Sequence, residues 1–157
     1  MANGNSARTS PIGFFNFADS YFVAAKKLNG TRFRTTHPDS PTRFLYHQTL
    51  ELYLKSFLLL KGESIDSIFG HRLVQLGNRA GKLGLSLELT HKAVFRSFDR
   101  LNTVISARYL EVGYYEGVIA LEDIDKACTS LRQEIAQHLQ SLGNPIFTLQ
   151  IGERAKA

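Results

Sequence analysis

SPTRFLYHQTLELYLKSFLLLKG, residues 40–62, contains the clearest helix start in the chain. Ser40 is the expected N-cap, because its hydroxyl can accept from the free N–H groups of a first turn, and Pro41 fits the first helical position. Lys61-Gly62 is a typical helix end. Helical spacing puts one set of apolar side chains on a single face: Phe44, Leu50, Leu54, Phe57 and Leu58. The stretch therefore predicts a long amphipathic helix. Glu51 and Lys55 are expected to form an i,i+4 pair worth roughly a few tenths of a kcal/mol.

Apolar residues at helical spacing predict four more amphipathic helices around this stretch. They cover about residues 14–28, 65–83, 87–109 and 121–142, and the second of them is interrupted at Gly70. The first carries Phe14, Phe17 and Tyr21 on its apolar face, and the last carries Cys128 among its apolar residues. Because the connections are mostly short, we expect an all-α fold, an antiparallel four- to five-helix bundle.

The helical region is expected to form one domain between two short terminal segments. We divide the chain into a flexible N-terminus (1–12), a helical-bundle domain (13–142) and a C-terminal tail (143–157). In the tail Phe147, Leu149 and Ile151 alternate with polar residues, a period of two that is typical of a short extended segment.

Composition limits the class of protein. The 157 residues are 43% hydrophobic and 21% charged, as in an ordinary globular domain. Cys128 is the only cysteine, which excludes an internal disulfide framework and a cysteine-based zinc cluster, and the histidines contain no HxxxH pair. Leu58–Leu60, the most apolar run, is far too short to span a bilayer, and the N-terminus lacks a signal-peptide core. We expect a cytoplasmic protein with no metal, other cofactor or membrane contact.

The formal charge of +5 is distributed unevenly. Residues 26–43 and 72–108 are basic, whereas residues 111–125 are acidic. Lys92, Arg96 and Arg100 recur every fourth residue, so they lie within about 80° of one another on the predicted helix. Such a basic surface can lie along a phosphate backbone. A solvated polar face is the alternative interpretation.

Arg108 points the other way, toward the apolar side of the same helix, because it lies seven residues after Leu101. A guanidinium in that position needs a carboxylate, carbonyl groups or a bound anion. Tyr109, Tyr114 and Tyr115 add hydroxyls and ring faces nearby. We expect these four residues to bind a nucleotide or phosphate, with structural pairing of Arg108 inside the bundle as the alternative.

Three histidines are candidate catalytic groups together with Arg108. His47 lies on the apolar side of the helix at 40–60, His71 lies near the start of the next helix, and His138 lies in the apolar stripe of the last helix. A hydrogen-bonded core position is the alternative for His47, and helix capping is the alternative for His71.

Several short motifs resemble HEPN domains (higher eukaryotes and prokaryotes nucleotide-binding). Glu51-Leu52-Tyr53-Leu54-Lys55, followed by leucines and Gly62, resembles their second helix, and His71-Arg72-Leu73 follows after a short connection as in that family. Arg108-Tyr109 before an acidic helix start resembles the Arg-Tyr element of the type associated with minimal nucleotidyltransferases. The resemblance covers roughly residues 14–142.

The resemblance implies a helical bundle that forms a homodimer and is often paired with a nucleotidyltransferase as a toxin–antitoxin system. Active members are metal-independent ribonucleases in which an arginine is followed, after four to six residues, by a histidine. After Arg108 the corresponding positions hold Gly113, Tyr114 and Tyr115. Arg132 and His138 match that spacing but are about 9 Å apart along one helix and about 120° around it, so within one subunit they would not converge on one phosphate. A site that they share across a dimer is the alternative interpretation.

We therefore expect a non-catalytic HEPN-like domain that binds a nucleotide or RNA beside a nucleotidyltransferase partner. A working ribonuclease, with Arg108 and a histidine from another helix or subunit, is the first alternative. A helical protein-interaction module is the second alternative.

Overall fold

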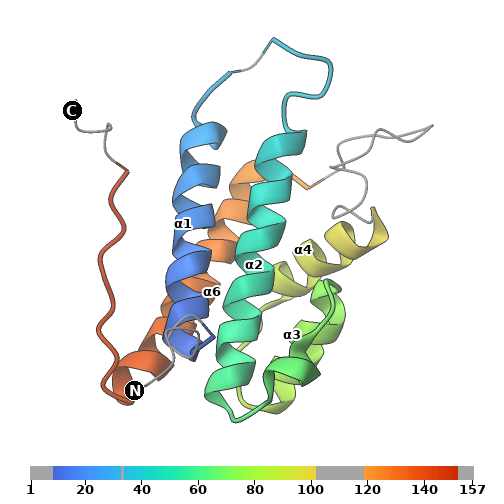
Figure 1. Ribbon diagram of the computed structural model, residues 1–157. Coiled ribbons are helices and arrows are strands. Elements are labelled where there is room, and N and C mark those ends of the chain that lie inside the picture. The colour runs from blue at the N-terminus through green and yellow to red at the C-terminus, as the bar shows by residue number, and fades with distance from the viewer. Residues whose placement is uncertain (1–8, 33, 102–118, 152–157) are drawn as a thin grey trace.

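The central helix of the bundle is α2 (Ser40–Leu60). In the computed structural model, which describes residues 9–32, 34–101 and 119–151, it packs against α1 (Pro11–Asn29), α3 (Leu73–Lys82) and α6 (Leu121–Ser141) (Figure 1). All ten residues from 49 to 58 are buried. Because ten residues make about three helical turns, α2 is enclosed on every side over that length, and not on one face alone as its pattern predicts.

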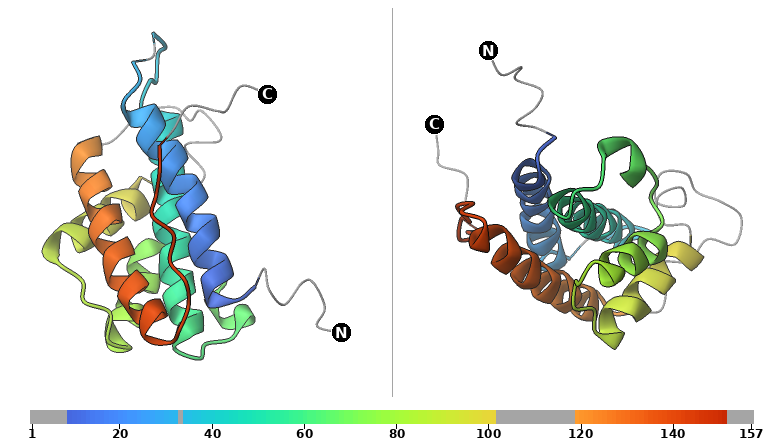
Figure 2. Two further views of the ribbon diagram at one scale, coloured as in Figure 1. Left: turned by 90° about the vertical axis from the view of Figure 1, so that its left-hand side faces the viewer. Right: turned by 90° about the horizontal axis from the view of Figure 1, so that it is seen from below.

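The remaining helices cover α2 in two groups. α1 runs antiparallel to α2 and α6, whereas α2 and α6 run in the same direction (Figure 1 and Figure 2). On the other side lie the 3₁₀ helix η1 (Ile65–Ile68), α3 and α4 (Leu89–Arg100). α3 and α4 form an antiparallel pair, because the end of α4 hydrogen-bonds the start of α3. The described ranges contain no strand, so the predicted all-α bundle is confirmed.

Two predicted helix limits were wrong. The N-cap of α2 is Asp39, and Ser40 is already helical. α4 ends at Arg100 instead of continuing to residue 109. The predicted interruption at Gly70 is confirmed: the stretch 65–83 divides into η1 and α3, because Gly70 adopts a φ of 111°, a left-handed conformation that breaks the helix.

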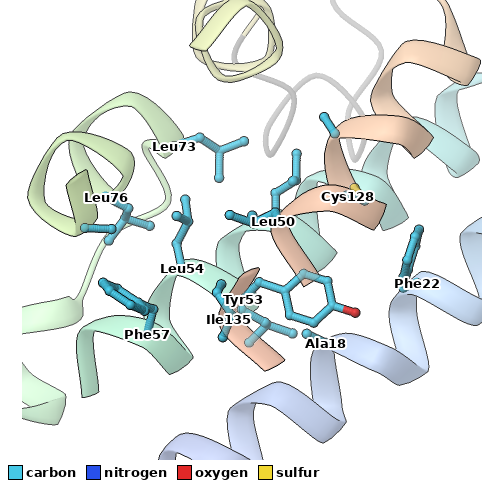
Figure 3. Packing of buried hydrophobic residues seen from close by; sticks show 14 of the residues in the cluster. Ala18, Phe22, Leu50, Tyr53, Leu54, Phe57, Leu73, Leu76, Cys128 and Ile135 are labelled. Atoms are coloured by element: carbon cyan, nitrogen blue, oxygen red, sulfur yellow. The ribbon is translucent and has the colours of Figure 1, made fainter. Parts of the chain in front are cut away.

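One apolar core joins the helices. Figure 3 shows Leu50, Leu54 and Phe57 of α2 beside Leu73 and Leu76 of α3. The buried apolar face of α1 consists of Phe15, Ala18, Phe22 and Ala25. The predicted face of α1 was therefore rotated by one residue, and Phe17 is 54% exposed. Cys128 is a core residue, as predicted, and burial raises the pKa of its thiol.

Two carboxylates tie α1, α2 and α6 together: Asp19, which is buried, and Asp125, which is half-buried. Asp19 of α1 accepts from the Tyr53 hydroxyl at 2.5 Å and from Arg132 Nε and Nη2 at 2.8 and 2.9 Å. Asp125 of α6 accepts from the Tyr46 hydroxyl at 2.7 Å and from Lys26 Nζ at 2.8 Å. Each carboxylate therefore joins all three helices, and both tyrosine pKa values are raised, mainly by burial.

The C-terminal tail follows the bundle as an extended segment alongside α1 (Figure 2). Arg132 Nη2 donates to the carbonyl of Phe147 at 2.8 Å, and Ile146 and Leu149 pack against the core. Phe147 and Ile151 are exposed. The extended conformation agrees with the prediction, but of the three alternating apolar residues only Leu149 faces the bundle.

A single histidine links α4 to α6. The Nδ1 atom of His91 accepts from the backbone N–H of Glu88, which caps α4, and its Nε2 atom lies 3.1 Å from the carbonyl of Ala127. Since a carbonyl only accepts, Nε2 carries the proton and the ring is neutral. Burial lowers the pKa of His91.

The close packing of α3 on α4 depends on Gly77. A Cβ at this position would lie 2.7 and 2.9 Å from two ring carbons of Phe95, which is buried, whereas a Cβ on Gly81 would meet only Leu87 at 3.8 Å. We expect Gly77→Ala to lower the free energy of unfolding by about 1–3 kcal/mol through overpacking. Gly81→Ala, one turn later, should raise it by about 0.5–1 kcal/mol through helix propensity. Urea denaturation of both variants tests this, and equal effects would contradict the packing described.

Candidate functional site

The candidate site lies where the middle of α2 meets the start of α3 and the end of α4. Its centre is the carboxylate of Glu51, which is buried. Lys55 Nζ lies 2.7 Å from Oε1, and His71 Nδ1 lies 3.0 Å from both oxygens. His47 Nδ1 is 3.8 Å from Oε2. We call His47, Glu51, Lys55 and His71 the Glu51 cluster.

Local backbone structure brings these residues together. His47, Glu51 and Lys55 occupy successive turns of α2, so their side chains share one side of that helix. His71 comes from the non-helical segment that follows Gly70. Asp99 of α4 then holds the first turn of α3, because its two carboxylate oxygens accept from the backbone N–H groups of Leu73 and Val74 at 2.8 and 2.9 Å. A carboxylate at a helix N-terminus also interacts favourably with the helix dipole.

His47 belongs to the interior. It is 1% exposed, its ring meets Phe98 edge-on at 5.5 Å between centroids, and it hydrogen-bonds the main chain of His71. Its Nδ1 atom is buried without a hydrogen-bond partner. Burial lowers the pKa of His47, although Glu51 and Asp99 oppose that shift. A bound substrate could not reach this ring without movement of the helices around it.

His71 is the accessible histidine of the cluster. Its side chain is 61% exposed, yet its Nδ1 atom is fixed on the buried carboxylate of Glu51. Because a carboxylate accepts and does not donate, Nδ1 carries a proton and Nε2 is left for a second partner. The carboxylate therefore fixes both the orientation and the tautomer of a histidine that faces solvent.

The predicted basic surface borders this cluster. Lys92, Arg96 and Arg100 are all exposed on α4, and within the described ranges none of them forms an ion pair. Arg96 lies one turn before Asp99, and Arg100 directly follows Asp99. Because Asp99 accepts from the first turn of α3, Arg96 and Arg100 both lie close to the N-terminus of α3. Arg72, the exposed N-cap residue of α3, adds a fourth cation there. The structure thus brings His71 to the edge of the predicted basic surface.

The other candidate residues lie elsewhere or cannot be placed. Arg108, Tyr109, Tyr114 and Tyr115 fall outside the described residues. His138 packs its ring on Phe57 at 5.1 Å, and its Nε2 atom is 3.7 Å from Glu134. Arg132 binds Asp19 and the tail, so Arg132 and His138 have separate partners, as their positions on one helix predict.

Sequence reasoning missed the importance of Glu51 and Asp99. We expected the Glu51–Lys55 pair to be a weak i,i+4 interaction of the kind found on helix surfaces, and it is buried instead. The available signal was the apolar neighbourhood of Glu51, since residues 50, 52, 53 and 54 are Leu, Leu, Tyr and Leu. No local pattern marks Asp99, because the backbone groups that it caps lie 25 and 26 residues away.

Comparisons with known proteins do not identify the site: no protein-family model, curated protein or solved structure matches this chain. Within the described part of the chain, no group of three or more His, Cys, Asp or Glu residues is placed to hold a metal ion. Among the same residues, no helix has the length and apolar character needed to cross a bilayer.

The two buried histidines predict a loss of stability in weak acid. His47 and His91 have pKa values below the ordinary 6.5 in the folded state, mainly because of burial. The unfolded chain therefore binds more protons than the folded chain as the pH falls through about 6.5. We expect the free energy of unfolding to decrease between pH 7 and pH 5.5, by up to about 1 kcal/mol for each histidine.

Urea denaturation at several pH values tests this expectation. His47→Gln and His91→Gln should each make the free energy of unfolding less dependent on pH in this range. His37→Gln, in the loop between α1 and α2, is the matched control and should leave the dependence unchanged. An unchanged dependence in both buried variants would show that neither ring is held neutral by the fold.

Proposed function

We propose that this protein is a helical RNA-binding domain whose binding surface is formed by Lys92, Arg96 and Arg100 of α4. The observation that supports the proposal is the exposure of these three cations on one side of a helix, without an acidic partner among the described residues. Side chains that are not neutralised within the protein can displace the counterions of a phosphate backbone.

The surroundings of this surface suit single-stranded RNA. Arg72 and His71 extend the surface across the start of α3, and a guanidinium or imidazole ring can stack on an unpaired base as well as bind a phosphate. In this proposal Arg108 binds phosphate, and Tyr109, Tyr114 or Tyr115 contact the nucleotide. A homodimer and a nucleotidyltransferase partner belong to the same proposal and rest on the resemblance to HEPN domains.

Salt dependence of RNA binding gives a direct test. The triple variant Lys92→Gln, Arg96→Gln and Arg100→Gln should bind a short single-stranded RNA at least about tenfold more weakly at low salt. The slope of log Kd against log salt concentration should also decrease by about 2, since each lost phosphate contact contributes about 0.7 for a single strand. Fluorescence anisotropy at several salt concentrations measures both quantities.

A matched control removes the same charge elsewhere. Lys27, Lys61 and Lys126 are also exposed but lie on α1, after α2 and on α6. Their triple replacement by Gln should weaken binding less and leave the slope nearly unchanged. Equal losses in the two triple variants would mean that net charge alone, and not the α4 surface, attracts the RNA.

The His71–Glu51 pair favours metal-independent RNA cleavage as a second candidate function. Nε2 of His71 would accept the proton of a ribose 2′-hydroxyl while the 2′-oxygen attacks the adjacent phosphorus. The 5′-oxygen leaves with a proton from a general acid, and the products are a 2′,3′-cyclic phosphate and a 5′-hydroxyl. Arg108 or Arg100 would stabilise the charge that develops on the phosphate.

Cleavage of a labelled RNA in the presence of a chelator tests this second function. His71→Gln should lower the rate by about a hundredfold or more, the usual range for a lost general base. His37→Gln is the control and should cleave at the wild-type rate. Loss of cleavage in His71→Gln with RNA binding retained would assign catalysis to His71, whereas equal rates in both variants would exclude it.

A further inference from the structure

A polar cleft lies at the end of the bundle where α1 ends and where α2 and α6 begin. Its volume is about 480 Å³, and it is lined by the last residues of α1, the α1–α2 loop and the first residues of α2 and α6. This volume lies within the usual range for small-molecule sites. The cleft shares no residue with the Glu51 cluster or with the α4 surface.

Arg43 is the distinctive residue of this cleft. It lines the cleft although it is only 8% exposed, and its Nε atom is buried without a hydrogen-bond partner. It forms no ion pair with any residue that the structure describes. A buried guanidinium is costly unless it is paired, so Arg43 places beside the cleft a cation with a donor that no residue of the described ranges uses.

Two helix N-termini point their positive ends at the same cleft. Asp39 at the start of α2 and Ala120 at the start of α6 both line it, and neither side chain makes a capping hydrogen bond. Leu121 and Glu122, the first two residues of α6, also line the cleft. The first N–H groups of a helix have no partner within the helix, so they can donate to an anion.

The acidic residues of the cleft restrict which anion fits. Asp39 and Glu122 would repel a ligand that is negative throughout, but their carboxylates can accept from hydroxyl groups. Arg32 adds a second, exposed cation to the lining. This combination suits a ligand that has a phosphate at one end and several hydroxyls at the other.

We propose that the cleft binds a small hydroxylated phosphate monoester, such as a sugar phosphate or a nucleoside monophosphate. The phosphate lies on Arg43 and on the first N–H groups of α6, and the hydroxyls lie on Asp39 and Glu122. This proposal is independent of RNA binding by the α4 surface.

Calorimetric titration of the full chain tests the proposal with ribose 5-phosphate, adenosine monophosphate and their parents without phosphate, ribose and adenosine. We expect at least one of the two phosphate esters to bind and its parent not to bind. The ester that binds more tightly shows whether the ligand is a sugar phosphate or a nucleoside monophosphate. Arg43→Met and Arg32→Met should weaken binding, the former by at least about tenfold because a charge-assisted, two-donor contact is lost. Arg34→Met, in the same loop but outside the cleft, should bind as the wild type does.

Thermal unfolding separates binding from a structural role of Arg43. Without ligand, Arg43→Met should have an unchanged or higher Tm, because the variant no longer buries an unpaired charge. The phosphate ester should raise the Tm of the wild type and of Arg34→Met, and raise that of Arg32→Met less. A parent compound that binds as tightly as its ester would overturn the proposal. Equal binding by Arg32→Met and Arg34→Met, or no rise in wild-type Tm with either ester at millimolar concentration, would also overturn it.

Discussion

The enclosure of α2 is the constraint on which the rest of the structure depends. A helix that is buried on every side must satisfy each polar side chain that it carries inward, because an unpaired buried group costs several kcal/mol. α2 satisfies most of them through partners on its neighbours: Tyr46 and Tyr53 donate to carboxylates of α6 and α1, and Glu51 accepts from Lys55 of α2 itself and from His71 before α3. The Nε atom of Arg43 and the Nδ1 atom of His47 are the exceptions. The positions of the surrounding elements are thus tied to the polar residues of one helix, as well as to its leucines.

The fold class followed from periodicity, and the errors have physical causes. Helical spacing located α1, α2 and α6 correctly because they carry many apolar residues at that spacing. The apolar face of α1 was misjudged, since aromatic residues occur on two adjacent faces and only tertiary packing selects Phe15 and Phe22 over Phe17. The interruption at Gly70 was predicted, but its consequence was not. It places His71 against the buried carboxylate of Glu51, and these two residues are twenty positions apart in the sequence.

The part of the candidate site that depends on local helix geometry was predictable from the sequence. The spacing of Lys92, Arg96 and Arg100 predicts their common exposed side, since a helix surface is set by local geometry. Nothing in the sequence favours His71 over His47 or His138 as a catalytic candidate. Only the structure distinguishes His71, through the exposure of its side chain and its contact with Glu51. No sequence pattern distinguishes Arg43 from the other basic residues of the stretch 26–43. Its burial without a hydrogen-bond partner for Nε depends on the folded structure.

The ion pairs between α1 and α6 have a consequence for biosynthesis. Asp19 is joined to Arg132 across 113 residues, and Lys26 to Asp125 across 99. Until α6 has left the ribosome, Asp19 lacks Arg132, and Lys26 and Tyr46 lack Asp125. The apolar residues of α1 and α2 that face α6 also remain uncovered. Contacts of such long sequence separation slow folding, and exposed apolar surface invites aggregation. The nascent chain therefore depends on α6 to complete its core, and ribosome stalling before residue 121 should leave a species that recruits chaperones.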